Sequence, residues 1–197
     1  MTNALVLASE SPSRAASLTA AGIKFEVRPA LIDEGAVKQA MWAEHATAAD
    51  TAFMLAGLKA YRVRATSALV LAADQLLVCD GVWFDKPPTL DAAREQLQTL
   101  RGKMHELVTA VVVFQDGVEI WRNLAIPRLR MRNFSDAFLE DYLAGEGAAL
   151  LTAVGAYRLE ARGINLFDQI EGEHSAILGL PLLPLLGFLR AQGMLQE

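Results

Sequence analysis

The feature that most constrains this chain is an apolar run that passes directly into a capped helix. Residues 4–8 are apolar, and the polar stretch SESPSR follows them, with Ser11 immediately before Pro12. Serine is a preferred N-cap, and proline is favoured at the first helical position. The pattern therefore predicts a buried strand over 4–8 and a helix over 12–21 that ends at Gly22.

Apolar runs and helical patterns alternate along the rest of the chain. A buried strand is predicted over 68–74, and Asp80-Gly81 predicts the turn of a hairpin within 76–84. The other expected elements are a strand over 25–29, a helical region over 36–65, helices over 90–101, 136–144 and 182–192, strands over 104–114 and 118–131, and short strands and loops over 145–180. This mixture predicts one α/β domain over residues 1–197.

Composition narrows the class of protein. Of the 197 residues, 53% are hydrophobic and 21% are charged, which suits one domain with a sizeable core. No apolar run approaches the roughly 18–20 residues that span a bilayer, and no basic stretch precedes the first apolar run, so we expect no membrane association and no secretory leader. The single cysteine, Cys79, excludes an intrachain disulfide and a cysteine-cluster metal site. We therefore expect a cytoplasmic protein.

The start of the predicted 12–21 helix is a candidate anion site. Free amides and the positive end of the helix dipole meet there, and Ser9 and Ser11 add hydroxyl donors. The guanidinium of Arg14 can donate two parallel, charge-assisted hydrogen bonds to an anion. The net charge of −5 argues against broad nucleic-acid binding, although a few local cations can hold a small anion. The alternative, an ordinary N-cap beside a surface arginine, stays open.

Asp74 is the second candidate. It follows six apolar residues, at the point where the 68–74 strand is expected to meet a loop. Ligands bind at the carboxyl ends of strands in open α/β sheets, and a carboxylate there can bind a metal or act as a base. An aspartate that merely caps a turn is the alternative.

Lys59 interrupts an apolar helix face. It shares that face with Ala52, Leu55, Ala56 and Val63. Lysine is rarely buried without a partner, so Lys59 is either a phosphate ligand or a side chain whose ammonium reaches solvent at the edge of the face. Lys86, which precedes two prolines, and the adjacent carboxylates Asp33 and Glu34 are weaker candidates, since each can equally be a solvated loop charge.

Together, these residues resemble the motifs of the Maf-like nucleoside triphosphate pyrophosphatases, nearly from end to end. One such motif would be weak, but eight in order at fitting spacing are specific. The matching motifs are SESPSR (9–14), IDE (32–34), LAGLKA (55–60), AADQ (72–75), DKP (85–87), GAY (155–157), IEG (170–172) and SAILGLPL (175–182).

The resemblance implies an elongated mixed sheet flanked by helices, with two lobes around a nucleotide-binding cleft. It also implies hydrolysis of a nucleoside triphosphate to the monophosphate and pyrophosphate by attack of water at the α-phosphorus, with Mg²⁺ or Mn²⁺ as a divalent cation. By this resemblance, Asp74 is the catalytic carboxylate that activates the water, and Asp74 and Glu34 ligate the metal. The residues implied to hold the triphosphate are Ser9, Ser11, Arg14, Lys59 and Lys86.

Three positions separate the branches of this family by substrate, and in this chain they are Ser13, Gln75 and Glu160. The branch that prefers dTTP and UTP has arginine, threonine and glutamine there, whereas the branch that prefers 7-methyl-GTP typically has tryptophan, glutamine and glutamate. Gln75 and Glu160 therefore favour 7-methyl-GTP, while Ser13 fits neither branch. A carboxylate at Glu160 can also accept hydrogen bonds from the N1–H and the 2-amino group of guanine.

Two alternatives stay open. The enzyme could prefer dTTP, UTP or another modified nucleotide, or the chain could be a weakly active nucleotide-binding protein that regulates septum formation through a partner. The presence of Asp74, Lys59 and Lys86 argues for an enzyme, because a binding module needs no base to activate water. The expected partner is a small-molecule nucleotide, without nucleic acid or membrane, and the sequence leaves open whether two copies form a homodimer.

Overall fold

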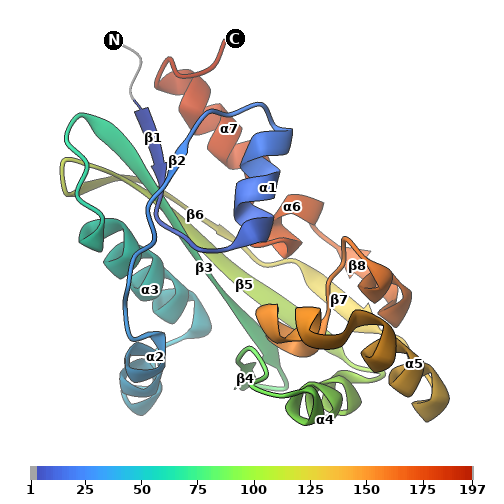
Figure 1. Ribbon diagram of the computed structural model, residues 1–197. Helices are drawn as coiled ribbons and strands as arrows, with labels where there is room; N and C mark the ends of the chain where they lie inside the picture. Colours follow the sequence, from blue (N-terminus) through green and yellow to red (C-terminus); the bar gives the residue numbers. More distant parts are fainter. Residues whose placement is uncertain (1–3, 197) are drawn as a thin grey trace. The chain divides into compact units, whose positions relative to one another are not determined.

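The computed structural model describes residues 4–196, which form an α/β fold (Figure 1). The α-helices are α1 (Pro12–Ala20), α2 (Glu34–Ala43), α3 (Ala48–Arg62), α4 (Leu90–Leu100), α5 (Asp136–Glu146), α6 (His174–Ile177) and α7 (Leu182–Ala191). The strands are β1 (Ala4–Leu7), β2 (Glu26–Val27), β3 (Ala68–Cys79), β4 (Val82–Phe84), β5 (Met104–Gln115), β6 (Val118–Ala125), β7 (Arg128–Met131) and β8 (Phe167–Glu171). Three 3₁₀ helices are η1 (Gly147–Thr152), η2 (Val154–Ala156) and η3 (Arg162–Leu166). No helix within residues 4–196 is long and apolar enough to cross a membrane.

The strands form one mixed sheet. Its order is β2-β1-β3-β5-β7-β8, with β4 paired to β3 and β6 paired to β5. β1 runs parallel to β2 and β3, whereas the pairs β3–β4, β5–β6, β5–β7 and β7–β8 are antiparallel. The predicted class, a mixed sheet flanked by helices, is confirmed.

The chain divides into two compact units, and β3 and β5 contribute residues to both. The first unit runs through Gln75 and adds Val108–Ala125 and the segment from Glu173 onward. The second unit comprises Leu76–Leu107 and Ile126–Gly172.

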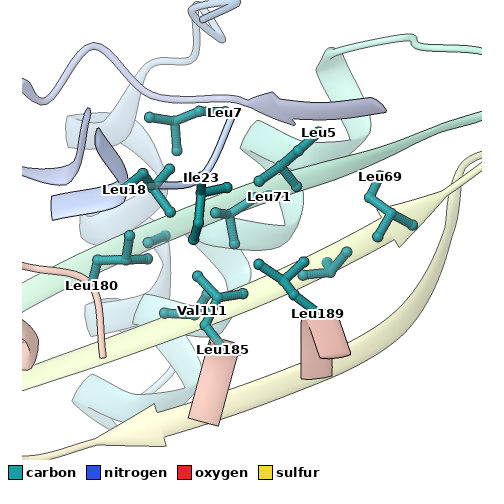
Figure 2. Close-up of a cluster of buried hydrophobic side chains, with 12 residues drawn as sticks. Leu5, Leu7, Leu18, Ile23, Leu69, Leu71, Val111, Leu180, Leu185 and Leu189 are labelled. Carbon is teal, nitrogen blue, oxygen red and sulfur yellow. The ribbon is translucent and has the colours of Figure 1, made fainter. Parts of the chain in front are cut away.

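One face of the sheet in the first unit packs against α1 and α7. Leu69 and Leu71 of β3 lie in a cluster with Leu18 of α1 and with Leu185 and Leu189 of α7 (Figure 2). Side chains two residues apart in a strand point to the same face, so this spacing of leucines selects one side of β3. Burial of these large side chains holds both helices on the sheet.

The opposite face in the same unit packs against α3. Val70 and Ala72 of β3 lie with Ala56 and Ala60 of α3 in a second buried cluster. The small alanines on both elements let the helix backbone approach the strand closely. Because helices cover both faces, β3 needs apolar residues at consecutive positions rather than at alternate ones.

The helical region predicted over 36–65 is confirmed, but it is not continuous. The region forms two helices, α2 and α3, separated by a turn in which His45 has a φ of 55°. Helix α3 begins with its own cap, because Thr47 Oγ1 accepts a hydrogen bond from the Asp50 amide at 3.1 Å. The sequence contains no glycine or proline that would mark this break.

The strand expected over 118–131 also divides in two. Pro127 lies between β6 and β7, and proline cannot donate to a strand ladder. β6 pairs with Thr109–Gln115 of β5, whereas β7 pairs with the beginning of that strand. The predicted hairpin turn is confirmed, since Asp80 and Gly81 have φ values of 50° and 79° and connect β3 to β4.

A histidine lies in the core of the second unit. His105 of β5 is 1% exposed, and its Nε2 lies 2.9 Å from the hydroxyl of Tyr157. Both rings pack against Phe167. Burial lowers the pKa of His105 from its ordinary 6.5 to about 4, because the interior disfavours the charged imidazolium.

Acid should therefore destabilise the protein through His105. The unfolded chain protonates this side chain near pH 6.5 and the folded chain only near pH 4. The stability contributed by the neutral ring is thus complete above pH 6.5 and is lost as the pH falls to 4, which lowers the free energy of unfolding by about 3 kcal/mol. Urea unfolding at several pH values measures this slope.

Two variants isolate the contribution of His105. His105→Gln should remove this part of the pH dependence, while His45→Asn, at an exposed position, should retain it. An unchanged slope in His105→Gln would contradict the role of the buried ring.

Candidate active site

Asp74 lies within a strand rather than at its end. The prediction that the strand stops at Asp74 is wrong, because β3 continues to Cys79. The neighbouring strand does stop: Leu7 of β1 pairs with Leu71, and the Ala8 amide donates to the Leu71 carbonyl at 2.8 Å before the chain turns to α1 (Figure 1). Asp74 therefore lies on β3 just beyond the carboxyl end of β1, on the strand face that α3 covers.

Lys59 is buried and joins two carboxylates. It is 7% exposed, on the face of α3 that carries Ala56. Its Nζ lies 2.5 Å from Asp74 Oδ1 and 2.6 Å from Glu34 Oε1. The alternative in which the ammonium reaches solvent is therefore wrong, since two acidic side chains hold it in the interior.

Glu34 opens helix α2 rather than lying in a loop. Asp33 is the N-cap, and its Oδ1 accepts a hydrogen bond from the Ala36 amide at 3.0 Å. Glu34 is the first helical residue, and its half-exposed side chain reaches Lys59. The loop prediction is confirmed for Asp33, which lies just outside the helix, and is wrong for Glu34. The two carboxylates have different tasks: Asp33 caps a helix, whereas Glu34 binds the ammonium.

Arg14 is buried at the start of α1. Ser11 caps this helix as predicted, and its Oγ accepts a hydrogen bond from the Arg14 amide at 3.4 Å. The guanidinium donates from Nε to the Gly179 carbonyl at 2.9 Å and from Nη1 to Ser9 Oγ at 3.1 Å. The alternative of a surface arginine beside an ordinary cap is therefore wrong.

The charged residues of this site act on one another. Burial lowers the pKa of Arg14, while the nearby carboxylates of Asp74 and Glu34 act in the opposite direction by favouring the charged guanidinium. Five predicted residues of the first unit thus come together: Ser9, Arg14, Glu34, Lys59 and Asp74. The group offers two cations, two carboxylates and a hydroxyl.

Gln75 belongs to the opposite face of β3 from its neighbour Asp74. Its Nε2 donates to Thr109 Oγ1 at 2.7 Å and to the carbonyls of Ala176 and Ile177 at 2.9 and 3.3 Å. These three acceptors fix the amide with its nitrogen toward β5 and α6. The oxygen Oε1 is then the atom that Gln75 can offer to a ligand.

The three remaining predicted residues belong to three different segments of the chain. Ser13 is half-buried in the first turn of α1. In the second unit, Lys86 is exposed between β4 and α4, and Glu160 is exposed with its Oε1 3.4 Å from Arg158 Nε. The participation of Lys86 and Glu160 in a common site with Asp74 stays a prediction.

Two residues that hold this site were missed by sequence reasoning. Thr109 is fully buried and binds Gln75, and its position inside the apolar run LVTAVVVF is a signal that could have found it. Gly179 has a φ of 90°, and a Cβ there would lie 3.2 Å from Arg14 Nε. Glycine is therefore needed where the backbone approaches the guanidinium.

The carboxylates of Asp74 and Glu34 fit a divalent cation. Both contact one ammonium, so they lie close enough to share a positive charge. Mg²⁺ is usually bound by one or two carboxylates together with waters and substrate phosphates. This donor set suits such a partial site, and within the described range no cluster of three or more His, Cys, Asp or Glu forms a fuller one.

Comparison with known families decides the relationship. A family model described as Maf-like protein matches residues 4–192. This chain belongs to the Maf family. The resemblance inferred from the eight motifs is thereby confirmed.

Curated relatives of this Maf protein are similar over nearly their whole length. A nucleoside triphosphate pyrophosphatase from Granulibacter bethesdensis is 55% identical over 188 residues, which cover 94% of this chain and 95% of the relative. A protein of the same name from Rhodospirillum rubrum is 48% identical, with 97% and 96% covered. A 7-methyl-GTP pyrophosphatase from Brucella abortus is 44% identical, with 98% of each chain covered.

Gly179→Ala should loosen Arg14 in this Maf protein. The substitution forces alanine to a φ of 90° against the guanidinium. The free energy of unfolding should therefore fall by about 1–3 kcal/mol. Denaturant unfolding measures the loss.

Gly187→Ala is the matched control. Gly187 lies within α7, and the space around its Cβ position is open, so alanine there should raise stability by about 0.5–1 kcal/mol. A Gly179→Ala variant as stable as the Gly187→Ala variant would contradict a close approach of the backbone to Arg14.

Proposed function

We propose that this Maf protein hydrolyses a nucleoside triphosphate to the monophosphate and pyrophosphate, with 7-methyl-GTP as its preferred substrate. The observation that carries the activity is the buried Lys59 ammonium between Asp74 and Glu34, close to Arg14. Such a site combines cations for an anionic substrate with a carboxylate that can act as a base. The names of the relatives, nucleoside triphosphate pyrophosphatase and 7-methyl-GTP pyrophosphatase, support the same reaction.

The reaction needs a positioned base and neutralised phosphates. The oxygen of a water forms a bond to the α-phosphorus while the bond from phosphorus to the α,β-bridging oxygen breaks, so pyrophosphate leaves. Lys59 orients the Asp74 carboxylate through Oδ1, and Oδ2 accepts the proton of the attacking water. Arg14 and Lys59 stabilise the charge that develops on the phosphates.

The serines and Lys86 complete the proposed triphosphate site. Ser9 Oγ accepts a hydrogen bond from Arg14, so its own hydroxyl proton can be donated to a phosphate oxygen. Ser11 stands at the N-terminus of α1, where helix amides and the dipole favour anions. Lys86 supplies a further cation in this proposal.

A divalent cation, Mg²⁺ or Mn²⁺, forms part of the proposal. Asp74 and Glu34 would hold it, and when bound it supplies positive charge to the triphosphate and the leaving pyrophosphate. Lys59 neutralises the same two carboxylates in the structure itself, which explains how they are tolerated side by side.

The choice of 7-methyl-GTP depends on two acceptors. The N1–H and the 2-amino group of 7-methylguanine are donors, and Glu160 with the Oε1 of Gln75 supplies acceptors of the matching kind. Ser13 lacks the ring face of tryptophan, so base stacking in this chain must come from another residue.

A pyrophosphate-release assay over a nucleotide panel with Mg²⁺ tests the proposal. We expect 7-methyl-GTP to be turned over faster than GTP, dTTP or UTP, and a chelator to abolish the turnover. Fast hydrolysis of dTTP or UTP without hydrolysis of 7-methyl-GTP would overturn the substrate. No turnover of any nucleotide would overturn the enzyme and favour a nucleotide-binding regulator of septum formation.

Asp74→Asn should remove the base while keeping the shape of the site. The asparagine oxygen can still accept a hydrogen bond from Lys59 but cannot take the proton of water, so turnover should fall by about 10²–10⁴-fold. Nucleotide affinity, measured by calorimetry, should change little. Asp50→Asn, at an exposed position on α3, is the control and should leave turnover unchanged. Wild-type rates in Asp74→Asn would show that the base lies elsewhere.

Glu160→Gln should alter selectivity more than maximal rate. Loss of a charged acceptor should lower the preference for 7-methyl-GTP over UTP by about tenfold, measured as the ratio of their kcat/KM values. Glu171→Gln, at an exposed position of β8, is the control and should keep the ratio. An equal loss on both nucleotides in Glu160→Gln would indicate a structural role instead.

A further inference from the structure

One segment holds both Arg14 and Gln75 through backbone carbonyls. Residues 173–183, here called the 173–183 loop, contain α6 and the first residues of α7. The Gly179 carbonyl accepts the hydrogen bond from Arg14 Nε, and the Ala176 carbonyl accepts the bond from Gln75 Nε2, both at 2.9 Å. The position of this loop therefore sets the orientation of two side chains that come from different elements, α1 and β3.

A single carboxylate closes the 173–183 loop. Glu173 Oε1 accepts hydrogen bonds from the amides of Leu182 and Leu183 at 2.9 and 3.0 Å, and from the hydroxyl of Ser175. These amides open α7, whose N-cap residue, Pro181, has no capping side chain. Glu173 thus caps α7 from nine residues upstream and ties the two ends of the loop together.

The hydroxyl of Ser175 strengthens the same closure. Ser175 Oγ accepts a hydrogen bond from the Leu182 amide at 2.9 Å while it donates to Glu173 Oε1. The Leu182 amide is therefore shared between two acceptors that are themselves hydrogen-bonded. Loss of Glu173 leaves the Leu183 amide without its acceptor and frees the Ser175 hydroxyl.

We propose that Glu173 is a positioning residue of the nucleotide site, an inference that rests on the function proposed above. Through loop closure it fixes the carbonyl that orients the phosphate-binding Arg14 and the carbonyl that orients the base-selecting Gln75. Glu173 itself does not touch the nucleotide. One carboxylate thereby sets both the affinity for the triphosphate and the preference for the base.

Glu173→Ala should loosen both side chains without removing the base Asp74. Loss of the cap should speed hydrogen exchange of the Arg14 Nε–H, followed by NMR, by about five- to tenfold. KM for 7-methyl-GTP should rise by about fivefold, while kcat stays within about twofold of wild type. The ratio of kcat/KM for 7-methyl-GTP over UTP should also fall, because Gln75 loses its fixed orientation.

Three variants separate positioning from general stability. Glu173→Gln keeps an accepting oxygen, so its KM should remain within about twofold of wild type. Ser175→Ala is a milder substitution that leaves Glu173 in place. It should change the hydrogen-exchange rate of the Arg14 Nε–H and the KM in the same direction as Glu173→Ala. Ser135→Ala removes the N-cap of α5, where Ser135 Oγ accepts from the Phe138 amide, and should lower stability without changing KM.

The outcomes are distinct. An Arg14 exchange rate in Glu173→Ala and Ser175→Ala equal to that of wild type would overturn the inference, as would equal losses in Glu173→Gln and Glu173→Ala. A fall in kcat with unchanged KM would also overturn it. If wild type turns over no nucleotide, the proposed hydrolysis fails by itself, and the exchange rate still decides whether Glu173 fixes Arg14.

Discussion

The buried ammonium of Lys59 is the interaction on which the site depends. It binds Asp74 of β3 and Glu34 of α2 from a position on α3, so three elements meet at one charge. Lys59 and Asp74 are almost fully removed from solvent, and breaking a buried pair of this kind by removing one partner typically costs about 3–5 kcal/mol. The alanines of α3 and β3 permit this arrangement, because their small side chains let the helix lie near enough to the strand for Lys59 to reach Asp74.

Because β1 ends early, a substrate can approach the charge of Lys59 at the carboxyl end of this strand. β1 stops after Leu7, whereas β3 continues past Asp74. The chain that leaves β1 supplies Ser9 and the capping Ser11, and it leads directly into Arg14 of α1. Hydroxyls, helix amides and a guanidinium are therefore gathered at the carboxyl end of one parallel strand, which is the usual position for an anion in an α/β sheet.

The sequence predicted the elements that depend on local signals. The Ser11 cap and the Asp80-Gly81 turn are confirmed, because each follows from a short pattern with a direct physical cause. The break between α2 and α3 was missed, since alanine-rich sequence on both sides favours helix and no glycine or proline stands at the break, although the Thr47 cap is a local signal of it.

The sequence predicted the charged residues of the site but not the groups that hold these residues in place. Lys59 and Asp74 stood out because a charge within an apolar pattern is unusual. The continuation of β3 beyond Asp74 was missed, since a carboxylate after six apolar residues suggested a strand end. In the structure, the next residue, Gln75, is satisfied by Thr109 and by two carbonyls from about a hundred residues further along the chain. Supports such as the Gly179 carbonyl belong to the backbone, which carries no side-chain signal in the sequence.

The alternation of β3 has a consequence for how this protein can evolve. Asp74 and Gln75 are neighbours in the chain, yet successive side chains of a strand point to opposite faces of the sheet, so the two residues contact different partners. A substitution at Gln75 alters contacts with β5 and α6 and leaves the ion pair of Asp74 intact. Under the proposed function, a point mutation at Gln75 can therefore change the preferred nucleotide while Asp74 stays in place. A single-residue insertion or deletion before Asp74 would instead exchange the faces of the two residues and disrupt the contacts of both.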